Sequence, residues 1–335
     1  MLKKRKLWLI MLMVGVLVLG GCVSKDSSSN VEMKDKQLEG NLIIYHAGSL
    51  TIPFEFLEQK FEEKYPKVDV IRTPGGSRTI ARKVTEFGDA VDILCSADYT
   101  VIDTLVMPKF ANWNALFAEN SMVIMYSKES KYADEITSEN WYEILTREGV
   151  NYGHSDPNAD PCGYRSVLLW QLAENHYGVK GLNAKLIENC PEKNIRAKSV
   201  ELIAMLETGA LDYAFEYESV GMQRAKINPD LMYVKLPKEI NLSSIEYKDD
   251  YVKSAIKLDG RTPGEFITKK GQPIVYSLTM PNTGKNNEIA VEFLKFLFDK
   301  EQGMRLLEEA GQPVLDNIKV FGEENLPMKL QDIVK

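Results

Sequence analysis

The chain has 335 residues, of which 44% are hydrophobic and 27% are charged, a balance typical of folded rather than disordered proteins. Its formal net charge of −7 argues against a nucleic-acid-binding surface over the whole chain. The four cysteines form no CxxC pair and the three histidines are far apart in sequence, which disfavours a zinc ribbon, a thioredoxin-type site and a His-rich metal site.

Residues 1–21 have the organisation of a secretory signal peptide. Basic residues 3–6 (KKRK) precede an apolar run of about 13 residues, short of the roughly 20 that span a bilayer. The alternative is an uncleaved membrane anchor. Because two glycines directly precede Cys22, the stretch resembles a lipoprotein box, and we expect cleavage before Cys22 and lipidation of this cysteine. Cleavage would remove four positive charges and change the net charge from −7 to −11.

Residues 22–40 are predicted to be the lipidated cysteine and a flexible tether, because they are polar and show no apolar periodicity. No later apolar run approaches membrane-spanning length. We therefore expect the rest of the protein to lie at the outer face of the cytoplasmic membrane, held there by its lipid anchor.

Beyond the tether, predicted strands alternate with predicted helices. Three short apolar runs are strand candidates, at residues 41–46, 68–72 and 91–95. The helix after the first strand has an apolar face that includes Phe54 and Phe61, and the next helix has Ile80, Val84 and Phe87 at helical spacing. This alternation favours a parallel sheet with helices on its faces.

The second half of the chain continues the pattern with less regular spacing. Further strands are predicted at residues 122–126, 211–217, 232–236 and 274–280. Helices are predicted at residues 164–176, 200–207, 287–298 and 301–310. We find no internal repeat, so the sequence predicts an α/β protein rather than a solenoid.

Three predicted turns share one design, in which a strand ends and a helix begins at a small polar or acidic residue. They are Gly48-Ser49, Gly76-Ser77 and Asp160-Pro161-Cys162-Gly163. Helix starts expose free N–H groups, so several that converge beyond the strand ends would bind an anion without net positive charge. The alternative is that each is an ordinary helix cap. Neither GxxxxGK[ST] nor a GxGxxG after a strand is present, which argues against a nucleotide site.

Two acids are the second signal of a site. Asp160 lies in a tight turn, and Glu216 lies in a hydrophobic strand between Phe215 and Tyr217. An acid in such a strand is costly if it is buried without a partner, although strand alternation could instead point it to solvent. Glu218 follows two residues later on the same face, so either glutamate could be the functional one.

These motifs together resemble a known family. The segments HAGSL (46–50), PGGSR (74–78), DPNADPCGYR (156–165) and DYAFEYESV (212–220), with the lipoprotein-type N-terminus, are similar to the exported oxyanion-binding component of tungstate/molybdate ABC transporters, nearest to the Wtp-type branch. The resemblance extends from residue 41 to the C-terminus. It implies a periplasmic-binding-protein fold of type II, with two α/β lobes joined by a hinge and the ligand in the cleft between them.

The resemblance also implies lobe limits, partners and an absence of catalysis. Lobe one would comprise residues 41–120 and 282–335, and lobe two residues 121–281. The protein would be a monomer without enzymatic activity or a cofactor, would bind tungstate or molybdate, and would deliver it to an ABC permease and its ATPase. Closure of the lobes would distinguish loaded from empty protein.

By the same resemblance, individual residues receive roles at the oxyanion. Gly48, Ser49 and Ser77 would donate hydrogen bonds to oxo groups. The segment Asp160-Pro161-Cys162 would supply a carboxylate and backbone N–H groups. A second carboxylate would come from Glu216, which is preferred over Glu218. Tyr233 would supply a hydroxyl. Asp160 and Glu216 would add two oxygen ligands to the tungsten or molybdenum, giving a six-coordinate centre that sulfate and phosphate have no tendency to form.

Several alternatives stay open on the sequence alone. A protein of the same fold could bind sulfate, phosphate or a ferric complex, and tungstate is not separated from molybdate. A tethered serine hydrolase would need Ser49 or Ser77 beside a base such as His46, but no GxSxG elbow is present. Cys162 could form a disulfide with Cys95 or Cys190. Arg78 and Arg165 follow two of the turns and could attract the anion or form surface salt bridges.

Overall fold

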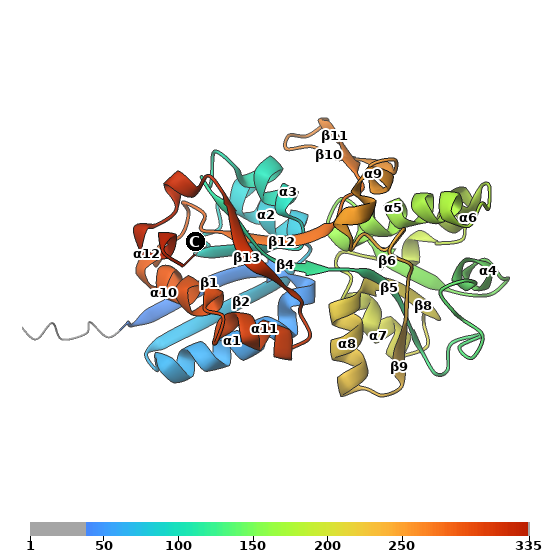
Figure 1. The fold of residues 1–335 in the computed structure, drawn as a ribbon, viewed down its shortest axis with the longest axis horizontal. Helices are drawn as coiled ribbons and strands as arrows, with labels where there is room; N and C mark the ends of the chain where they lie inside the picture. Colours follow the sequence, from blue (N-terminus) through green and yellow to red (C-terminus); the bar gives the residue numbers. More distant parts are fainter. Residues whose placement is uncertain (1–37, 334–335) are drawn as a thin grey trace, which may run out of the picture. The chain divides into compact units, whose positions relative to one another are not determined.

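The computed structural model describes residues 38–333, which fold around two β-sheets and a separate β-hairpin (Figure 1). The predicted signal peptide, the lipidation site Cys22 and nearly all of the predicted tether lie outside the described residues. Within residues 38–333, no helix has both the length and the apolar character needed to cross a membrane.

The first sheet is mixed rather than wholly parallel. β1 pairs in parallel with β2 and β3, whereas β12 runs antiparallel to β3 and β4. The parallel part therefore confirms the predicted alternation at the start of the chain. In spatial order the strands are β13 (Val314–Phe321), β4 (Asn114–Asn120), β12 (Ile274–Thr279), β3 (Ile93–Ser96), β1 (Gly40–Ala47) and β2 (Val68–Gly75).

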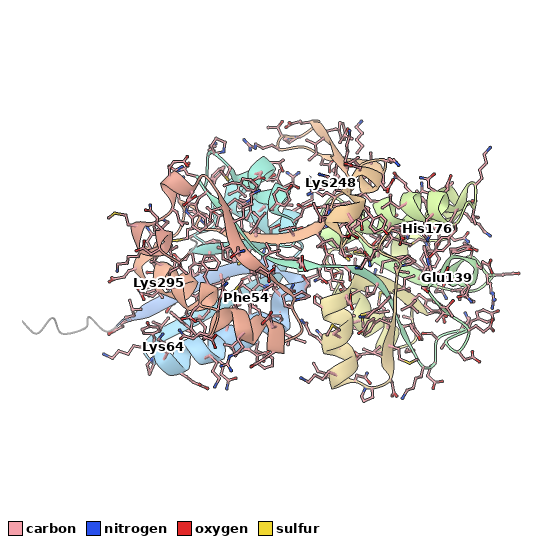
Figure 2. The ribbon with its side chains drawn as sticks, in the orientation of Figure 1. Phe54, Lys64, Glu139, His176, Lys248 and Lys295 are labelled. Atoms are coloured by element: carbon pink, nitrogen blue, oxygen red, sulfur yellow. The ribbon has the colours of Figure 1, made fainter. Side chains whose placement is uncertain are left out.

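The helices of the first sheet come from both ends of the chain. Helix α1 packs against α10 and α11 from the C-terminal part, and the Phe61 ring lies 5.1 Å from the Phe293 ring. Figure 2 shows Phe54 inside this part and Lys64 and Lys295 at its edge. The elements are η1 (Gly48–Leu50), α1 (Thr51–Lys64), α2 (Ser77–Glu86), α3 (Tyr99–Val101), the π-helical turn η2 (Ile102–Val106), α10 (Asn287–Phe298), α11 (Gly303–Glu309), η5 (Glu323–Asn325) and α12 (Met328–Gln331).

The second sheet has five strands, and β8 at its centre pairs in parallel with β6 and antiparallel with β5. In spatial order the strands are β7 (Ile195–Arg196), β6 (Tyr152–Ser155), β8 (Tyr213–Tyr217), β5 (Met122–Ser127) and β9 (Leu231–Lys235). The helices are α4 (Trp141–Leu145), α5 (Pro161–His176), α6 (Leu182–Glu188), η3 (Glu192–Asn194), α7 (Glu201–Glu207), α8 (Glu218–Ile227), η4 (Ile245–Tyr247) and α9 (Lys248–Tyr251).

Below, lobe one denotes the six-stranded sheet with its helices. Lobe two denotes the five-stranded sheet, its helices and the antiparallel hairpin of β10 (Ala255–Asp259) and β11 (Phe266–Lys270). The chain passes between the sheets at Ser121, between β4 and β5, and again at residues 271–273, just before β12. These two crossings are the hinge.

The structure differs from the sequence-based expectations in several places. β12 lies between β3 and β4 of lobe one, although the predicted limits placed it in lobe two, because an apolar strand pattern does not reveal which sheet the strand joins. Phe87 was expected on the packed face of α2, but this helix ends at Glu86 and the Phe87 side chain is 77% exposed. Several elements were not predicted: strands β4, β6, β7 and β13, the β10–β11 hairpin, and helices α3, α4, α6, α8, α9 and α12.

Candidate functional site

Two of the three predicted turns meet between the lobes. The start of α2 in lobe one lies against the turn before α5 in lobe two, where the Arg78 N–H donates to the Ala159 carbonyl at 3.1 Å. A Cβ atom at Gly76 would lie 2.5 Å from the Ala159 oxygen and 2.8 Å from the Ala197 oxygen. Only glycine allows this approach, which explains the second glycine of the PGGSR motif.

The remaining turn lies beside a different part of lobe two. Gly48 and Ser49 are buried at η1, and a Cβ at Gly48 would lie 3.2 Å from a methyl group of Val200. The Ser49 hydroxyl is 2.8 Å from the Tyr276 hydroxyl of β12. In the second turn, the Ser77 hydroxyl accepts a hydrogen bond from the Ala97 N–H at 3.0 Å, which leaves the Ser77 proton able to donate to a ligand.

Asp160 is the N-cap of α5, with Pro161 at the first helical position. Its carboxylate accepts from the Cys162 N–H at 3.4 Å and from the Ser199 N–H at 2.8 Å. Burial raises the pKa of the Asp160 carboxyl from 3.8 to about 6, although these hydrogen bonds act in the opposite direction. Pro161 and Cys162 are buried beside it.

Glu216 is fully buried, so the alternative that strand alternation points it to solvent is wrong. Its Oε2 accepts from the Tyr217 N–H at 2.6 Å, and Oε1 has no hydrogen-bond partner among the described residues. Burial raises the pKa of Glu216 from 4.5 to about 8, and the nearby Asp160 charge raises it further against hydrogen bonds from Tyr217 and Ser199. By contrast, Glu218 is partly exposed and forms an ion pair with Lys235 at 2.6 Å.

Cys162 and Ser199 connect the two buried acids. The Cys162 N–H donates to Asp160, and its Sγ lies 3.8 Å from Glu216 Oε2. Ser199 donates its N–H to Asp160, and its side chain acts to lower the pKa of Glu216. The structure therefore brings the two predicted carboxylates into one neighbourhood of lobe two. Cys95, Cys162 and Cys190 are all buried free thiols, so the disulfide alternative for Cys162 is wrong.

Tyr233 is not brought to this neighbourhood by any described contact. Its ring packs against Gly221 of α8, and within residues 38–333 it forms no hydrogen bond with the other predicted site residues. The tyrosine hydroxyl next to a predicted site residue is instead that of Tyr276, which contacts Ser49 and accepts a hydrogen bond from Asn120 at 3.0 Å.

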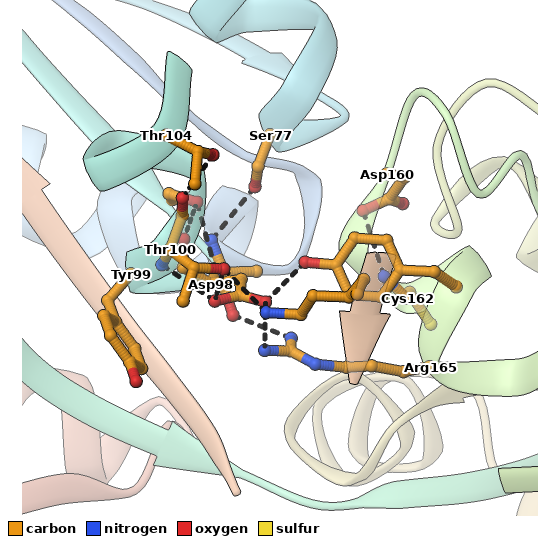
Figure 3. A network of polar contacts seen from close by, with 12 residues as sticks. Ser77, Asp98, Tyr99, Thr100, Thr104, Asp160, Cys162 and Arg165 are labelled. Atoms are coloured by element: carbon orange, nitrogen blue, oxygen red, sulfur yellow. Dashed lines mark hydrogen bonds and ion pairs between the residues drawn. The ribbon is translucent and has the colours of Figure 1, made fainter. Parts of the chain in front are cut away.

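The two arginines after the turns are buried, so the surface salt-bridge alternative is wrong for both. Arg165 of lobe two donates to the Ala97 carbonyl of lobe one at 2.7 Å and to the Tyr217 hydroxyl at 2.6 Å. Its Nη2 lies 3.3 Å from the Asp98 carboxylate (Figure 3). Arg78 of lobe one donates to the Asn158 carbonyl of lobe two at 3.1 Å. Each guanidinium thus joins the lobes.

Residues 42–311 match the family of bacterial extracellular solute-binding proteins. The chain belongs to this family. A protein of Petrotoga mobilis named as an uncharacterized solute-binding protein is 49% identical over 303 residues, which are 90% of this chain and 92% of that protein. The molybdate/tungstate-binding protein WtpA of Thermococcus kodakarensis is 38% identical over 97% of this chain and 96% of that protein. The protein of the same name from Pyrococcus abyssi is 40% identical over 91% of this chain and 92% of that protein.

Solved structures show the fold of this solute-binding protein. The periplasmic molybdate-binding protein of Azotobacter vinelandii superimposes with a TM-score of 0.60 at 15% identity, over 82% of this chain and all of that one. The sulfate-binding protein SubI of Mycobacterium tuberculosis superimposes with a TM-score of 0.59 at 14% identity, over 83% of this chain and 88% of that one. The predicted type II periplasmic-binding-protein fold is confirmed, and because these two proteins carry the names of different anions, the fold alone does not select a ligand.

A binding role also agrees better than hydrolysis with the hydrogen bonds of the solute-binding protein. Among residues 38–333, no histidine forms a hydrogen bond with Ser49 or Ser77. His46 is fully buried, and its Nδ1 lies 2.9 Å from the neighbouring Ala47 carbonyl. Burial lowers the pKa of His46 to about 4. A serine nucleophile would need a base within hydrogen-bond reach, which the described residues do not provide.

Three contributors to the site of the solute-binding protein escaped the sequence-based reasoning. Ser199 has a weak signal, since it is a small polar residue just before a predicted helix, like the three recognised turns. Tyr276 and Asp98 have no local signal. Their importance arises from contacts with residues far away in sequence: Tyr276 contacts Ser49, and Asp98 contacts Lys269.

Proposed function

We propose that this solute-binding protein captures tungstate or molybdate between its lobes and delivers the oxyanion to the permease of an ABC importer. The observation that carries the proposal is the buried pair Asp160 and Glu216. Among the described residues neither acid forms an ion pair, and one oxygen of Glu216 has no hydrogen-bond partner. Buried carboxylates without a cation are costly, so the pair fits a ligand that brings an electron-poor centre.

A tungstate or molybdate centre meets that requirement. High-valent tungsten and molybdenum are hard centres that favour oxygen ligands, so two carboxylate oxygens can extend the four oxo groups to six-fold coordination. Sulfur and phosphorus in sulfate and phosphate do not extend their coordination in this way. The hydroxyls of Ser49 and Ser77 and the N–H groups of η1 would donate to the oxo groups. The N–H groups of Arg78 and Cys162, at the starts of α2 and α5, already donate to Ala159 and Asp160.

The names of two relatives support the same ligand class. The Thermococcus and Pyrococcus proteins, both named as molybdate/tungstate-binding, are similar to this chain over nearly its whole length. Tungstate and molybdate have the same charge and tetrahedral shape, so we propose both ligands and leave their order of affinity to measurement.

Sulfate or phosphate is the competing ligand class, and the raised pKa values give it a specific mechanism. A protonated Glu216 could donate a hydrogen bond to a sulfate oxygen, whereas coordination to tungsten requires the ionised carboxylate. Sulfate binding by protonated Glu216 would therefore weaken as the pH rises through about 8. Tungstate binding by ionised Glu216 would strengthen over the same range, so the sign of the pH dependence separates the two.

The test is isothermal titration of the protein from residue 23 onward with tungstate, molybdate, sulfate and phosphate at pH 7 and pH 9. We expect one-to-one binding of the first two anions and none of the others. Glu216→Gln should abolish binding, whereas the matched control Glu218→Gln, two residues along the chain, should keep it. The proposal would be refuted if the protein bound sulfate or phosphate but not tungstate. It would also be refuted if Glu216→Gln bound tungstate with unchanged affinity.

We also propose that the protein is a monomer, without enzymatic activity or a resident cofactor, that is anchored by a lipid on Cys22 at the outer face of the cytoplasmic membrane. The apolar run before Cys22 supports this location. In the native host, Cys22→Ser should release the protein from the membrane fraction and abolish incorporation of a radiolabelled fatty acid. Membrane retention of the variant, together with no fatty-acid incorporation in the parent protein, would point to an uncleaved N-terminal anchor instead.

A further inference from the structure

The β10–β11 hairpin of lobe two is attached to both lobes. At its base, Ala255 exchanges two hydrogen bonds of 2.9 Å with the Gln171 side chain of α5. At its tip, the Arg261 guanidinium donates to the Thr104 carbonyl at 2.6 Å and to the Met107 carbonyl at 2.7 Å, both in lobe one. Figure 1 shows the hairpin extending from the side of α9 toward α2 and α3.

The contacts at the hairpin tip have favourable electrostatics. The Thr104 and Met107 carbonyls lie in and just after the turn η2, where helix carbonyls lack intrahelical partners and carry partial negative charge. From the other side, Arg82 of α2 donates to the Gly260 carbonyl at 2.6 Å, and Arg78 donates to the Asp259 carbonyl. Guanidinium groups from both lobes therefore hold the hairpin against lobe one.

The hairpin also places a buried lysine, Lys269, against lobe one. Lys269 is only 9% exposed, and its Nζ lies 2.5 Å from Asp98 Oδ2 and donates to the Thr100 hydroxyl at 2.6 Å. Asp98 is fully buried in lobe one and caps α3, accepting from the Thr100 N–H at 2.9 Å. Asp98 Oδ2 also accepts from the Tyr164 hydroxyl at 2.5 Å and lies 3.3 Å from Arg165.

Asp98 is thus held by three groups of lobe two: Tyr164, Arg165 and Lys269. Burial alone would raise the pKa of Asp98, but Lys269 and Arg165 hold it well below its usual range. Because the carboxylate belongs to one lobe and its cations to the other, the pairs exist only when the lobes meet. In a separated state all three charges would be accessible to water, so these contacts stabilise closure rather than the fold of either lobe.

The Asp98 contacts continue directly into the proposed ligand site. Arg165 donates to the Ala97 carbonyl, and the N–H of Ala97 donates to the Ser77 hydroxyl. Arg165 also donates to the Tyr217 hydroxyl, and the Tyr217 N–H donates to Glu216. Figure 3 shows Asp98 and Arg165 in one close-up with Ser77 and Asp160, which lie above them in this view. Closure and ligand contact therefore share residues.

We propose that Asp98 and Lys269 are positioning residues that hold the lobes closed around the oxyanion and so set its rate of release. This inference rests on the proposed function for the identity of the ligand. Removing the lysine would leave Asp98 with one fewer buried cation, and breaking a buried pair is strongly destabilising. The loss falls on the closed state, so it should appear in the dissociation rate more than in the association rate.

The experiment compares Lys269→Met with Lys270→Met in the protein from residue 23 onward. Lys270 is the next residue of β11 and is exposed, and its side chain forms no hydrogen bond or ion pair within the described chain, so it is a matched control. Tungstate release is measured by stopped-flow displacement with excess molybdate. We expect Lys269→Met to release tungstate at least about tenfold faster, with association changed less than about threefold, and Lys270→Met to match the parent protein.

Two further variants separate a positioning role from a merely structural one. Asp98→Asn keeps the oxygen that caps α3 but loses the charge, so it should also speed release, while Lys269→Arg should restore slow release. The urea midpoint of the ligand-free protein should stay within about 0.5 M of the parent in Lys269→Met. A lower midpoint with an unchanged dissociation rate would show that Lys269 only supports the fold, and would overturn the proposal.

Distance labels make the test independent of the ligand's identity. Spin labels at Gln59→Cys in α1 and Glu188→Cys in α6, both exposed positions, report the interlobe distance. Lys269→Met should lower the closed fraction relative to Lys270→Met, with or without tungstate. Failure of the parent protein to bind tungstate would refute the proposed function alone. An unchanged closed fraction and an unchanged dissociation rate in both Lys269→Met and Asp98→Asn would refute the closure role.

Discussion

Replacing Glu216 by glutamine should stabilise the ligand-free protein at alkaline pH although it abolishes tungstate binding. Burial raises the pKa of Glu216 from 4.5 to about 8, so the folded protein holds its proton more tightly than the unfolded chain does. The stability associated with this proton is fully present below about pH 4.5 and is lost as the pH rises to about 8. At about 1.4 kcal/mol for each pH unit, the loss approaches about 5 kcal/mol.

That loss is large compared with the stability of a typical domain, about 5–15 kcal/mol, so urea denaturation can resolve it. Free energies of unfolding would be measured for the parent protein, Glu216→Gln and the control Glu218→Gln at pH 5, 7 and 9 without oxyanion. Near pH 5 the parent and Glu216→Gln should differ little, because a protonated carboxyl and an amide are similar in size and polarity. At pH 9 Glu216→Gln should be several kcal/mol more stable.

The control fixes the interpretation of this comparison. Glu218 is partly exposed and paired with Lys235, so Glu218→Gln should follow the parent at each pH. Asp160, whose pKa burial raises from 3.8 to about 6, should add a smaller loss of about 3 kcal/mol that is complete near pH 6 and common to all three proteins. If the stability difference between Glu216→Gln and the parent were the same at pH 5 and pH 9, the buried-carboxyl reasoning would be wrong.

Three shorter predictions concern other parts of the site. Gly76→Ala should weaken tungstate binding at least about tenfold in calorimetry, because the new Cβ would lie 2.5 Å from the Ala159 oxygen of the opposite lobe. The melting temperature of the ligand-free protein should stay unchanged. An unchanged tungstate affinity would contradict this prediction. Tungstate binding at pH 7 should release about one proton, measured in buffers of different ionisation enthalpy, because Glu216 must ionise; no release would exclude carboxylate coordination. Cys162 should resist thiol reagents at pH 8 until urea unfolds the chain, because burial raises the pKa of its thiol well above the usual range; labelling of the native protein would show that the site opens readily.

The elements predicted from sequence are those whose burial pattern is local. β1 and α10 alternate or repeat apolar residues in a way that one short window reveals. β13 escaped prediction because most of its residues are exposed or half-buried at the edge of its sheet. The β10–β11 hairpin escaped for a similar reason, since its exposed strands are held by contacts with the opposite lobe rather than by their own apolar pattern.

The site shows the same division between local and long-range information. Asp160 and Glu216 were predicted because an acid at a helix start and an acid within an apolar strand are both visible locally. The choice of Tyr233 came from the resemblance alone, and the strand pattern around Tyr276 is no less suitable. Tyr276 reaches Ser49 across 227 residues of sequence, so only strand order could place them together. Asp98 likewise reads as an ordinary helix cap until Lys269 is placed beside it.

The two carboxyls and the Asp98 contacts together suggest how an empty protein avoids resembling a loaded one. Asp98 and Lys269 favour closure regardless of ligand, whereas burying ionised Asp160 and Glu216 opposes closure until an electron-poor centre arrives. The closed fraction of ligand-free protein, measured with the interlobe labels, should therefore fall as the pH rises from 6 to 9, with a midpoint near 8. Glu216→Gln should remove that dependence and stay closed. A closed fraction that did not change with pH in the parent protein would mean that the carboxyls do not control closure.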